Sequence, residues 1–298
     1  MRTIYLGTSD FAAAVLERLA DSPHRPALVV TRPDRPKGRG QRVQAPPVAD
    51  LARSLDLPLA QPNDVNEQSA RAQIAAASPD VVVVCAFGVL IRSELLAEHD
   101  MLNVHPSLLP RWLGAAPIER AIMAGDAETG VAIMRVTAGL DSGPVCLMER
   151  EPILPDDTFG TLSARLAALG GELLVRALDE RPAFVEQSED GVTYAEKVSA
   201  EDRVLNPRSS SAVELERTVR ALSPHVGARL ALPSGEYLGV WGARPAAGAA
   251  HEPGWLGNEG GRLLLATVDG ALELTVVQPP GKRQMPAADY LRGHGLSH

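Results

Sequence analysis

Residues 80–87 read DVVVVCAF, and this stretch decides the fold. Four consecutive valines and a cysteine follow Asp80, so neither face of a strand built from them carries a polar group. Strands that are apolar on both faces are typical of the centre of a parallel sheet that helices cover on both sides. The stretch therefore predicts a buried central strand, with Cys85 as a core residue.

The sequence on either side of this strand alternates between two hydrophobic periods. Strand-like patterns cover residues 3–7, 27–31, 101–104 and 131–136, and helix-like patterns cover 9–22, 48–57 and 161–178. Repeated alternation of this kind predicts an α/β fold, a Rossmann-like doubly wound parallel sheet. Ligands of such sheets bind beyond the carboxyl ends of the strands.

The pattern changes after about residue 181. An aperiodic stretch is followed by a helical pattern at 211–222 and by short strand-like runs with turn signals between them. Short strands at this spacing predict a small β-barrel, here OB-like. We expect a catalytic domain at 1–186, a linker at 187–204 and an OB-like C-terminal domain at 205–298.

Composition limits the class of protein. The 298 residues are 45% apolar and carry a formal net charge of −8, and the two cysteines have no metal-ligand spacing. No apolar run reaches membrane-spanning length, and the N-terminus lacks the apolar region of a signal peptide. We expect a monomer in the reducing cytoplasm, without membrane contact.

Two polar side chains follow the predicted strand at 101–104. Asn103 and His105 are two residues apart, so in an extended chain they project from the same face. Pro106 keeps His105 out of the helical region. The alternative is a strand that ends in a proline turn, with a hydrogen-bonded core histidine. The paired asparagine and the polar segment that follows favour a site.

Common cofactor motifs are missing near these residues. The first strand-to-helix turn, LGTSDF, has one glycine and no G-x-G-x-x-G, which counts against a dinucleotide. His105 and Asp141 alone are too few to hold zinc, and we expect no metal.

Asp141 completes a candidate catalytic group. It lies between Gly139 and Gly143, and a turn-forming aspartate beside glycine is the simpler interpretation of that residue alone. Together, Asn103, His105 and Asp141 offer an amide donor for an oxyanion, an imidazole and a carboxylate. Acyl transfer without a covalent nucleophile requires these groups.

Residues 103–134, NVHPSLLPRWLGAAPIERAIMAGDAETGVAIM, and the later GLDSG at 139–143 resemble the signature of the folate-dependent formyltransferases. The segments TRPDRPKGRGQR, TYAEK and QPPGKRQM narrow the resemblance to members of that family that formylate methionyl-initiator-tRNA. The resemblance implies transfer of a formyl group from the co-substrate 10-formyltetrahydrofolate to the α-amine of that tRNA. It departs at Leu113, where relatives usually carry arginine.

The resemblance also implies roles for individual residues. The catalytic residues would be Asn103, His105 and Asp141. The folate-binding residues would be Phe87, Gly88, Val89, Leu90, Ser107, Leu108, Leu109 and Pro110, with a cis peptide bond between the last two. The tRNA-binding residues would be Arg32, Arg35, Lys37, Arg39, Arg42, Lys282 and Arg283.

Two alternatives remain at this point. One is a sister formyltransferase that acts on an amino sugar or a purine precursor, which would not need the basic segment at 32–42. The other is a nucleic-acid-binding protein with a degenerate Rossmann domain, which would not need Asn103, His105 and Asp141 together.

Overall fold

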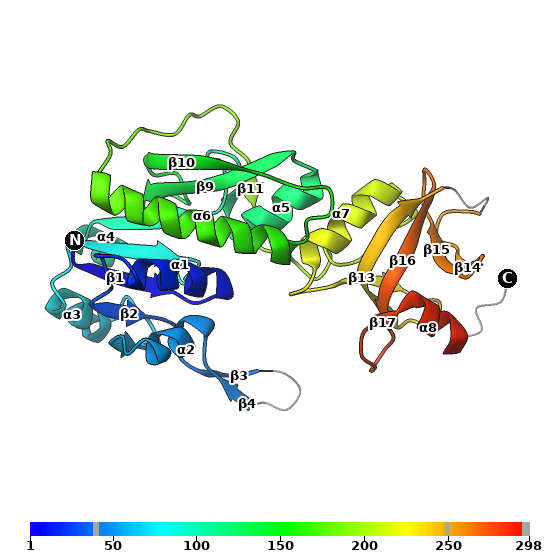
Figure 1. Cartoon of the computed structure of the whole chain (residues 1–298), viewed down its shortest axis with the longest axis horizontal. Coiled ribbons are helices and arrows are strands. Elements are labelled where there is room, and N and C mark those ends of the chain that lie inside the picture. Colours follow the sequence, from blue (N-terminus) through cyan, green and yellow to red (C-terminus); the bar gives the residue numbers. More distant parts are fainter. Residues whose placement is uncertain (38–41, 248–250, 294–298) are drawn as a thin grey trace. The chain divides into compact units, whose positions relative to one another are not determined.

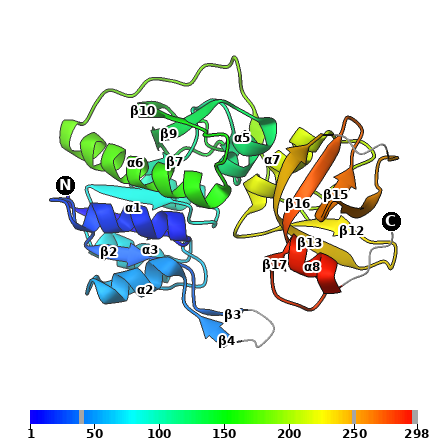
Figure 2. The same cartoon turned by 45° about the vertical axis from the view of Figure 1, so that its right-hand side comes forward.

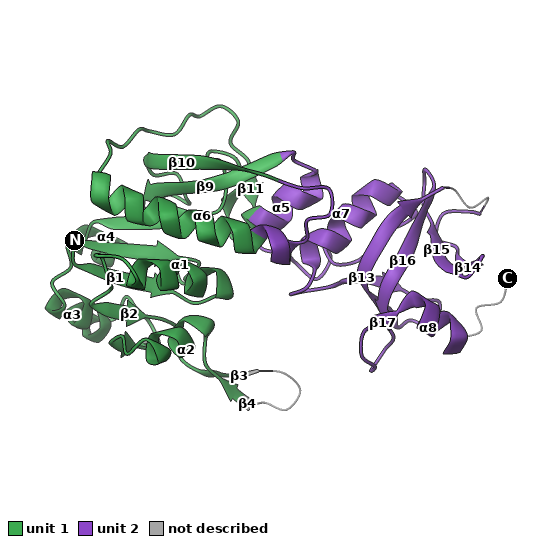
Figure 3. Cartoon of the chain, in the orientation of Figure 1, with its two compact units in different colours: residues 1–117, 128–152, 163–195 green, residues 118–127, 153–162, 196–298 purple. Residues whose placement is uncertain are grey.

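The structure is a computed structural model that describes residues 1–37, 42–247 and 251–293. The chain forms two compact units (Figure 3). Unit 1 comprises residues 1–117, 128–152 and 163–195, and unit 2 comprises 118–127, 153–162 and 196–298. These units divide the chain by contacts, whereas the predicted boundaries at 186 and 205 divide it into successive domains. The predicted domain boundaries therefore stay a prediction.

Unit 1 is built on a seven-stranded sheet of order β10-β9-β7-β6-β1-β2-β5 (Figure 1). Its strands are β1 (Thr3–Gly7), β2 (Leu28–Val30), β5 (Leu59–Ala60), β6 (Val81–Cys85), β7 (Met101–His105), β9 (Glu128–Arg135) and β10 (Val145–Pro152). The helices of the chain up to residue 180 are α1 (Asp10–Ala20), α2 (Pro47–Ser54), α3 (Gln68–Ala76), α4 (Ser93–Glu98), α5 (Pro117–Ala124) and α6 (Phe159–Glu180). The predicted α/β fold with a predominantly parallel sheet is confirmed.

The valine run forms the centre of this sheet, as predicted. Strand β6 is buried at all five positions and pairs in parallel with β1 on one side and β7 on the other. Val82 and Val84 pack in one cluster with Ile74 of α3 and Leu95 of α4. The opposite face receives α1, because the Tyr5 hydroxyl of β1 donates a hydrogen bond to the Ala12 carbonyl. Helices therefore cover both faces.

Helix α6 lies very close to the sheet and to α1 (Figure 2). A Cβ atom on Gly170 would lie 2.9 Å from Val104 Cγ1 of β7, and one on Gly171 would lie 2.7 Å from Arg18 Cβ of α1. Only glycine permits this approach. The contact also fixes which way β7 faces: Val104 points toward α6, so Asn103 and His105 point toward the other face.

Strand β9 differs from the simple parallel pattern. It pairs antiparallel with β7 and with β10. The chain between β7 and β9 contains β8 (Leu113–Gly114) and the eight-residue helix α5, and it does not form the crossover that a parallel partner needs. Strand β8 pairs instead with β11 (Tyr194–Ala195), which brings residue 194 beside the segment after His105.

Two short strands border the middle of the basic segment at 32–42. Strands β3 (Arg35–Lys37) and β4 (Arg42–Gln44) pair antiparallel, with Arg35 opposite Gln44 and Lys37 opposite Arg42. Residues 38–41, which include the predicted tRNA contact Arg39, lie outside the described residues.

Unit 2 contains the predicted C-terminal domain of antiparallel strands. Its elements after residue 196 are α7 (Ala212–Leu222), β12 (Ala228–Ala231), β13 (Tyr237–Ala246), β14 (Leu256–Glu259), β15 (Arg262–Ala266), β16 (Ala271–Gln278), β17 (Met285–Pro286) and α8 (Ala287–Gly293). The strand order is β12-β13-β16-β15-β14, and β17 pairs with β16. Helix α7 begins with a capping box of Ser211 and Glu214 and packs Leu215 and Val219 into the core of this unit.

Within the described ranges, no helix is long and apolar enough to cross a membrane.

Candidate functional site

The carboxyl ends of β6 and β7 form the edge at which the predicted site residues lie. The two strands pair in parallel, with Val84 opposite Asn103. Residues 86–90 follow β6 and residues 106–112 follow β7, so both connections leave the sheet at the same edge. Asn103 is half-buried and His105 is 4% exposed.

His105 is held by a backbone carbonyl. Its Nε2 lies 2.9 Å from the carbonyl oxygen of Trp112. A carbonyl oxygen only accepts hydrogen bonds, so Nε2 carries the hydrogen and Nδ1 faces the other way. Nδ1 lies 3.7 Å from Asp141 Oδ2, which is an electrostatic contact rather than a hydrogen bond.

Asp141 contacts both other predicted catalytic residues. Its Oδ1 accepts a hydrogen bond of 3.2 Å from the Asn103 amide, and its Oδ2 accepts one of 3.0 Å from the backbone N–H of Gly114. Asp141 has a φ of 44°, a left-handed conformation that costs about 1–2 kcal/mol for a residue other than glycine. The fold thus brings Asn103, His105 and Asp141 together around one carboxylate.

Gln187 holds the Asp141 loop, which we define as residues 137–144. Its side-chain N–H₂ donates to the carbonyl of Asp141 over 2.7 Å and to the carbonyl of Gly143 over 2.8 Å. Sequence reasoning missed this residue, because it lies in an aperiodic segment 46 positions from Asp141. The nearby TYAEK stretch gave no signal for a contact with this loop.

The segment after His105 turns tightly and is anchored from within. The buried Ser107 hydroxyl donates to the Arg111 carbonyl over 2.7 Å. Trp112 has a φ of 65°, and its N–H donates to the Thr193 hydroxyl over 2.9 Å. These bonds position the Trp112 carbonyl that receives His105 Nε2. The predicted cis peptide bond between Leu109 and Pro110 is present.

Leu113, which stands where relatives usually carry arginine, is a core residue. It is 4% exposed and packs with Leu109, Ala132 and Met134.

The predicted folate residues form two neighbouring loops. Phe87 is buried, and its carbonyl accepts a hydrogen bond of 2.8 Å from the Thr8 hydroxyl. Gly88 has a φ of 70°, and Leu90 exposes 79% of its surface. Val89 is half-buried, and Leu108 and Pro110 of the second loop are also half-buried. A loop that turns on glycine and presents an exposed leucine offers both backbone groups and an apolar wall.

The predicted tRNA residues fall in two places. Arg32 follows β2, and a Cβ atom added to Gly88 would lie 3.9 Å from its Nη1, so this arginine borders the loop after β6. Arg35 is exposed on β3. Lys37 and Arg42 pair through their backbones across the hairpin. Lys282 and Arg283 are exposed in unit 2, between β16 and β17.

Both cysteines are free thiols, with Cys85 buried and Cys146 half-buried. Burial raises the pKa of Cys85 to about 12, and burial also raises the pKa of Cys146. Since the thiolate is the attacking form, these raised pKa values lower the reactivity of both thiols near neutral pH. In the part of the chain that the structure describes, no three His, Cys, Asp or Glu side chains are grouped to hold a metal ion.

The chain is similar to formyltransferases in both units. The family model for formyl transferase matches residues 1–178, and the model for the formyl transferase C-terminal domain matches residues 197–295. Solved structures show the same fold at low identity. HypX from Aquifex aeolicus in complex with tetrahydrofolic acid has a TM-score of 0.67 and 18% identity, covering 98% of this chain and 47% of that chain. The N-formyltransferase of Helicobacter canadensis, in complex with folinic acid and dTDP-3-aminofucose, has a TM-score of 0.67 and 13% identity over 92% of this chain and 98% of that chain.

Curated relatives are much more similar. The methionyl-tRNA formyltransferase of Dechloromonas aromatica is 42% identical over 300 residues, covering 100% of this chain and 97% of the relative. The methionyl-tRNA formyltransferase of Halorhodospira halophila is 44% identical over 304 residues, covering 99% of this chain and 97% of the relative. At this identity over its full length, the chain belongs to the formyl transferase family, among the methionyl-tRNA formyltransferases.

Proposed function

We propose that the chain transfers the formyl group of 10-formyltetrahydrofolate to the α-amine of methionyl-initiator-tRNA and so produces N-formylmethionyl-tRNA. The observation that carries the proposal is the single carboxylate of Asp141, which contacts the Asn103 amide at 3.2 Å and faces the His105 imidazole at 3.7 Å. This group lies at the sheet edge where the two predicted folate loops leave β6 and β7.

The reaction requires stabilisation of an oxyanion. The free amine attacks the formyl carbon, a carbon–nitrogen bond forms, and negative charge develops on the formyl oxygen. The second N–H of the Asn103 amide and a protonated Nδ1 of His105 supply hydrogen bonds to that oxygen. Donors held in place before the reaction stabilise the developing charge without reorganisation.

The reaction also moves one proton. The attacking amine loses a proton, the bond between the formyl carbon and N10 of the folate breaks, and N10 gains a proton. Asp141 supports this transfer because its carboxylate holds the imidazolium form of His105 and accepts the proton of the amine, directly or through a water. The pKa of an α-amine is about 8, so a fraction of the free base is present at neutral pH.

The two loops fit a folate. The exposed side chain of Leu90 and the half-buried Val89 provide an apolar wall, and the left-handed turn at Gly88 exposes backbone groups beside it. Ser107 and Leu109 are buried and so anchor the second loop, which follows β7. When bound, the co-substrate supplies the formyl group at the oxidation level of the product. Apolar walls around the reacting atoms exclude water and strengthen the hydrogen bonds.

The choice of acceptor rests on the relatives and the charges. The relatives at 42% and 44% identity are named for methionyl-tRNA over the whole chain, whereas the sugar-bound neighbour shares the fold at 13% identity. Arg35 on the β3–β4 hairpin and the pair Lys282 and Arg283 supply positive charge for an anionic RNA. An amino sugar or a purine precursor would not need these groups.

The test is formylation in vitro. Purified protein is incubated with 10-formyltetrahydrofolate and methionyl-initiator-tRNA, and formylmethionine is detected after hydrolysis of the ester. His105→Ala is expected to lower kcat by roughly two to four orders of magnitude, the usual range for a positioned acid–base group. The matched control is His251→Ala, which removes an exposed histidine paired with Glu259 in unit 2. Equal rates for His105→Ala and the control would contradict the assignment, and formylation of a dTDP-amino sugar in place of the tRNA would favour the sister activity.

Two finer features belong to the same proposal. The enzyme acts as a monomer, which sedimentation at micromolar concentration tests. It acts in the cytoplasm, where charged tRNA is found, and a fluorescent fusion tests this location.

A further inference from the structure

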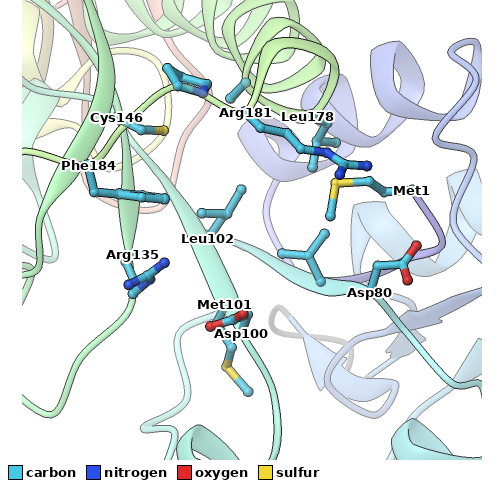
Figure 4. Close-up of a pocket in the computed structure, with 13 residues that line it drawn as sticks. Met1, Asp80, Asp100, Met101, Leu102, Arg135, Cys146, Leu178, Arg181 and Phe184 are labelled. Atoms are coloured by element: carbon cyan, nitrogen blue, oxygen red, sulfur yellow. The ribbon is translucent and has the colours of Figure 1, made fainter.

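Cavities in the described residues differ in the charges of their linings. A cavity of about 180 Å³ at the amino ends of β6 and β7 (Figure 4) has Asp80 and Asp100 as well as Arg135 and Arg181 in its wall. A second, of about 480 Å³ beside β5 and α3, is lined by Glu67 and neutral groups. The mixed or acidic walls of these two cavities select no ligand class.

The third cavity lies on the barrel of unit 2 and has a different lining. Its volume is about 210 Å³, and its wall includes Arg203, Arg229, Tyr237, Trp241, Gln278 and the turn at 279–281. No carboxylate occurs among the residues that line it. We call it the barrel cavity. Two cations and two aromatic rings without a counter-charge are complementary to an anion that carries a planar ring.

The aromatic part of the barrel cavity is preorganised. The Arg229 guanidinium lies over the Tyr237 ring, 4.4 Å from its centroid, and Tyr237 is 44% exposed. The Trp241 indole N–H donates to Gln278 Oε1 over 3.0 Å. Gly227 allows the indole to approach the backbone, because a Cβ atom there would lie 2.6 Å from Trp241 Cζ2. Ordered rings and guanidinium planes of this kind stack on unpaired bases.

The two guanidinium groups of the barrel cavity donate to neutral backbone carbonyls. Arg203 donates to the carbonyls of Gly227, over 3.1 Å, and Val226, over 2.9 Å. Arg229 donates to the Ala200 carbonyl over 2.9 Å, and its Nε is buried with no hydrogen-bond partner in the described ranges. Neutral carbonyls fix the orientation of both side chains without cancelling their charge.

The barrel cavity is continuous with the exposed basic turn after β16. Gln278, which binds Trp241, also donates its side-chain N–H₂ to the Lys282 carbonyl over 2.9 Å. The Lys282 N–H donates to the Pro279 carbonyl over 3.0 Å and closes the turn. One glutamine therefore links the aromatic wall of the cavity to the turn that presents Lys282 and Arg283.

We propose that the barrel cavity binds one unpaired nucleotide of an RNA. The base stacks against the Tyr237–Arg229 pair, and its phosphate faces the guanidinium groups of Arg203 and Arg229. That the RNA is methionyl-initiator-tRNA rests on the proposed function. The stacking contact itself is independent of the formylation chemistry.

The experiment measures binding to the full-length protein with two probes, a fluorescein-labelled uridine octanucleotide and initiator tRNA. Tyr237→Leu removes the ring, and affinity for both probes is expected to fall about tenfold or more, the usual effect of losing one base–aromatic stack. Tyr237→Phe keeps the ring and is expected to bind within about twofold of wild type. Octanucleotide binding that is absent in the wild type, or equal in the Leu and Phe variants, would overturn the proposal.

A second pair of variants separates the cavity from general electrostatics. Arg229→Gln and Arg262→Gln each remove one positive charge from the same barrel, but Arg262 lies on β15, 3.8 Å from Glu273. Arg229→Gln is expected to lower the salt dependence of octanucleotide binding by about 0.7 of a slope unit, and Arg262→Gln to leave it unchanged. The same salt dependence in the Arg229→Gln and Arg262→Gln variants would refute nucleotide binding in the barrel cavity. This pair decides the question if the melting curve of Tyr237→Leu shows that it does not fold.

The same measurements distinguish this proposal from the proposed function. One outcome is that the wild type does not formylate methionyl-tRNA while octanucleotide binding falls in Tyr237→Leu and not in Tyr237→Phe. That result would support the nucleotide site and contradict methionyl-tRNA as the formyl acceptor. If the wild type formylates methionyl-tRNA and the KM for this tRNA is the same in the Tyr237→Leu and Tyr237→Phe variants, the formyltransferase stands and the barrel cavity is not used.

Discussion

Replacing Gln187 with alanine tests how the Asp141 loop is held. The substitution removes both hydrogen bonds to the loop carbonyls, of 2.7 Å and 2.8 Å, and touches neither Asn103 nor His105. We expect the Asp141 carboxylate to move away from the other two side chains. The chemistry should therefore slow, although all three proposed catalytic side chains are still present.

The expected size follows from the geometry. Two hydrogen bonds stabilise the loop by roughly 1–3 kcal/mol together, at about 0.5–1.5 kcal/mol each. They oppose the tendency of Asp141 to leave its left-handed conformation, which has a φ of 44° and costs about 1–2 kcal/mol. The two quantities are similar, so without Gln187 the loop relaxes. A displacement of about 1 Å in a catalytic group lowers the rate up to about 100-fold. We expect kcat to fall between about 10- and 100-fold.

The assay is steady-state formylation with saturating methionyl-initiator-tRNA and varied 10-formyltetrahydrofolate, which gives kcat and the KM for the folate separately. The KM for 10-formyltetrahydrofolate is expected to change less than about threefold, because the hydrogen bonds of Gln187 go to the Asp141 loop and not to the proposed folate-binding segments. Gln187→Glu should be at least as slow, since a carboxylate has no hydrogen to donate to the two carbonyls. Gln73→Ala on the exposed face of α3 is the matched control, with wild-type kcat.

A double-mutant cycle tests the mechanism directly. If Gln187 acts through Asp141, then adding Gln187→Ala to Asp141→Ala should have almost no further effect. A further loss as large as that of the single variant would refute the reasoning. A kcat within about twofold of wild type for Gln187→Ala would show that the loop needs no external support.

Three further outcomes are expected. Asn103→Asp places a second carboxylate beside Asp141 and removes an oxyanion donor, so kcat should fall at least about 100-fold, measured in the same assay. Because burial raises the pKa of Cys85 to about 12, iodoacetamide at about pH 8 should label it only after unfolding, as mass spectrometry would show; rapid labelling of native protein would contradict this. The hydrogen bonds from Arg120 lower the pKa of Asp202 to about 2, below its ordinary 3.8, so the paired carboxylate stabilises the fold above about pH 4 and loses this effect as the pH falls toward 2. Urea midpoints of wild type and Asp202→Asn should therefore differ at about pH 5 and converge near pH 2, and a constant difference would speak against this pair.

The parts of the fold that follow from a local pattern were predictable. Because the valine run is apolar on both faces, it must be buried between two layers of helices. The central position of β6 and the helices that cover it follow from this. Asn103 and His105 share a face because of the strand pleat, which is also local. The direction of β9 could not be predicted in the same way. Its residues favour a strand, but its antiparallel direction depends on the connection through α5 and not on the residues of β9 itself.

The candidate site was predictable only in part, for the same reason. Asp141 could be named from its glycine neighbours and the family resemblance, but its contact with Asn103 depends on tertiary structure. Gln187 and the Trp112 carbonyl were missed because each acts through a contact that sequence spacing does not reveal. The cations at 35 and 42 lie on paired strands, because Val43 and Pro36 can pair across a hairpin in spite of the glycines between them.

The interleaving of the two units has a consequence for synthesis on the ribosome. Unit 2 takes residues 118–127 and 153–162 from the middle of the chain, yet most of its core comes after residue 196. Met123 packs against that core. It therefore leaves the ribosome before its packing partners exist, and about a hundred more residues must be translated before it can be buried. The sheet of unit 1, in contrast, has all its strands once residue 152 is out. Nascent chains arrested near residue 195 should therefore resist protease across the sheet but be cut within 118–127, and they should bind a chaperone that recognises apolar helices.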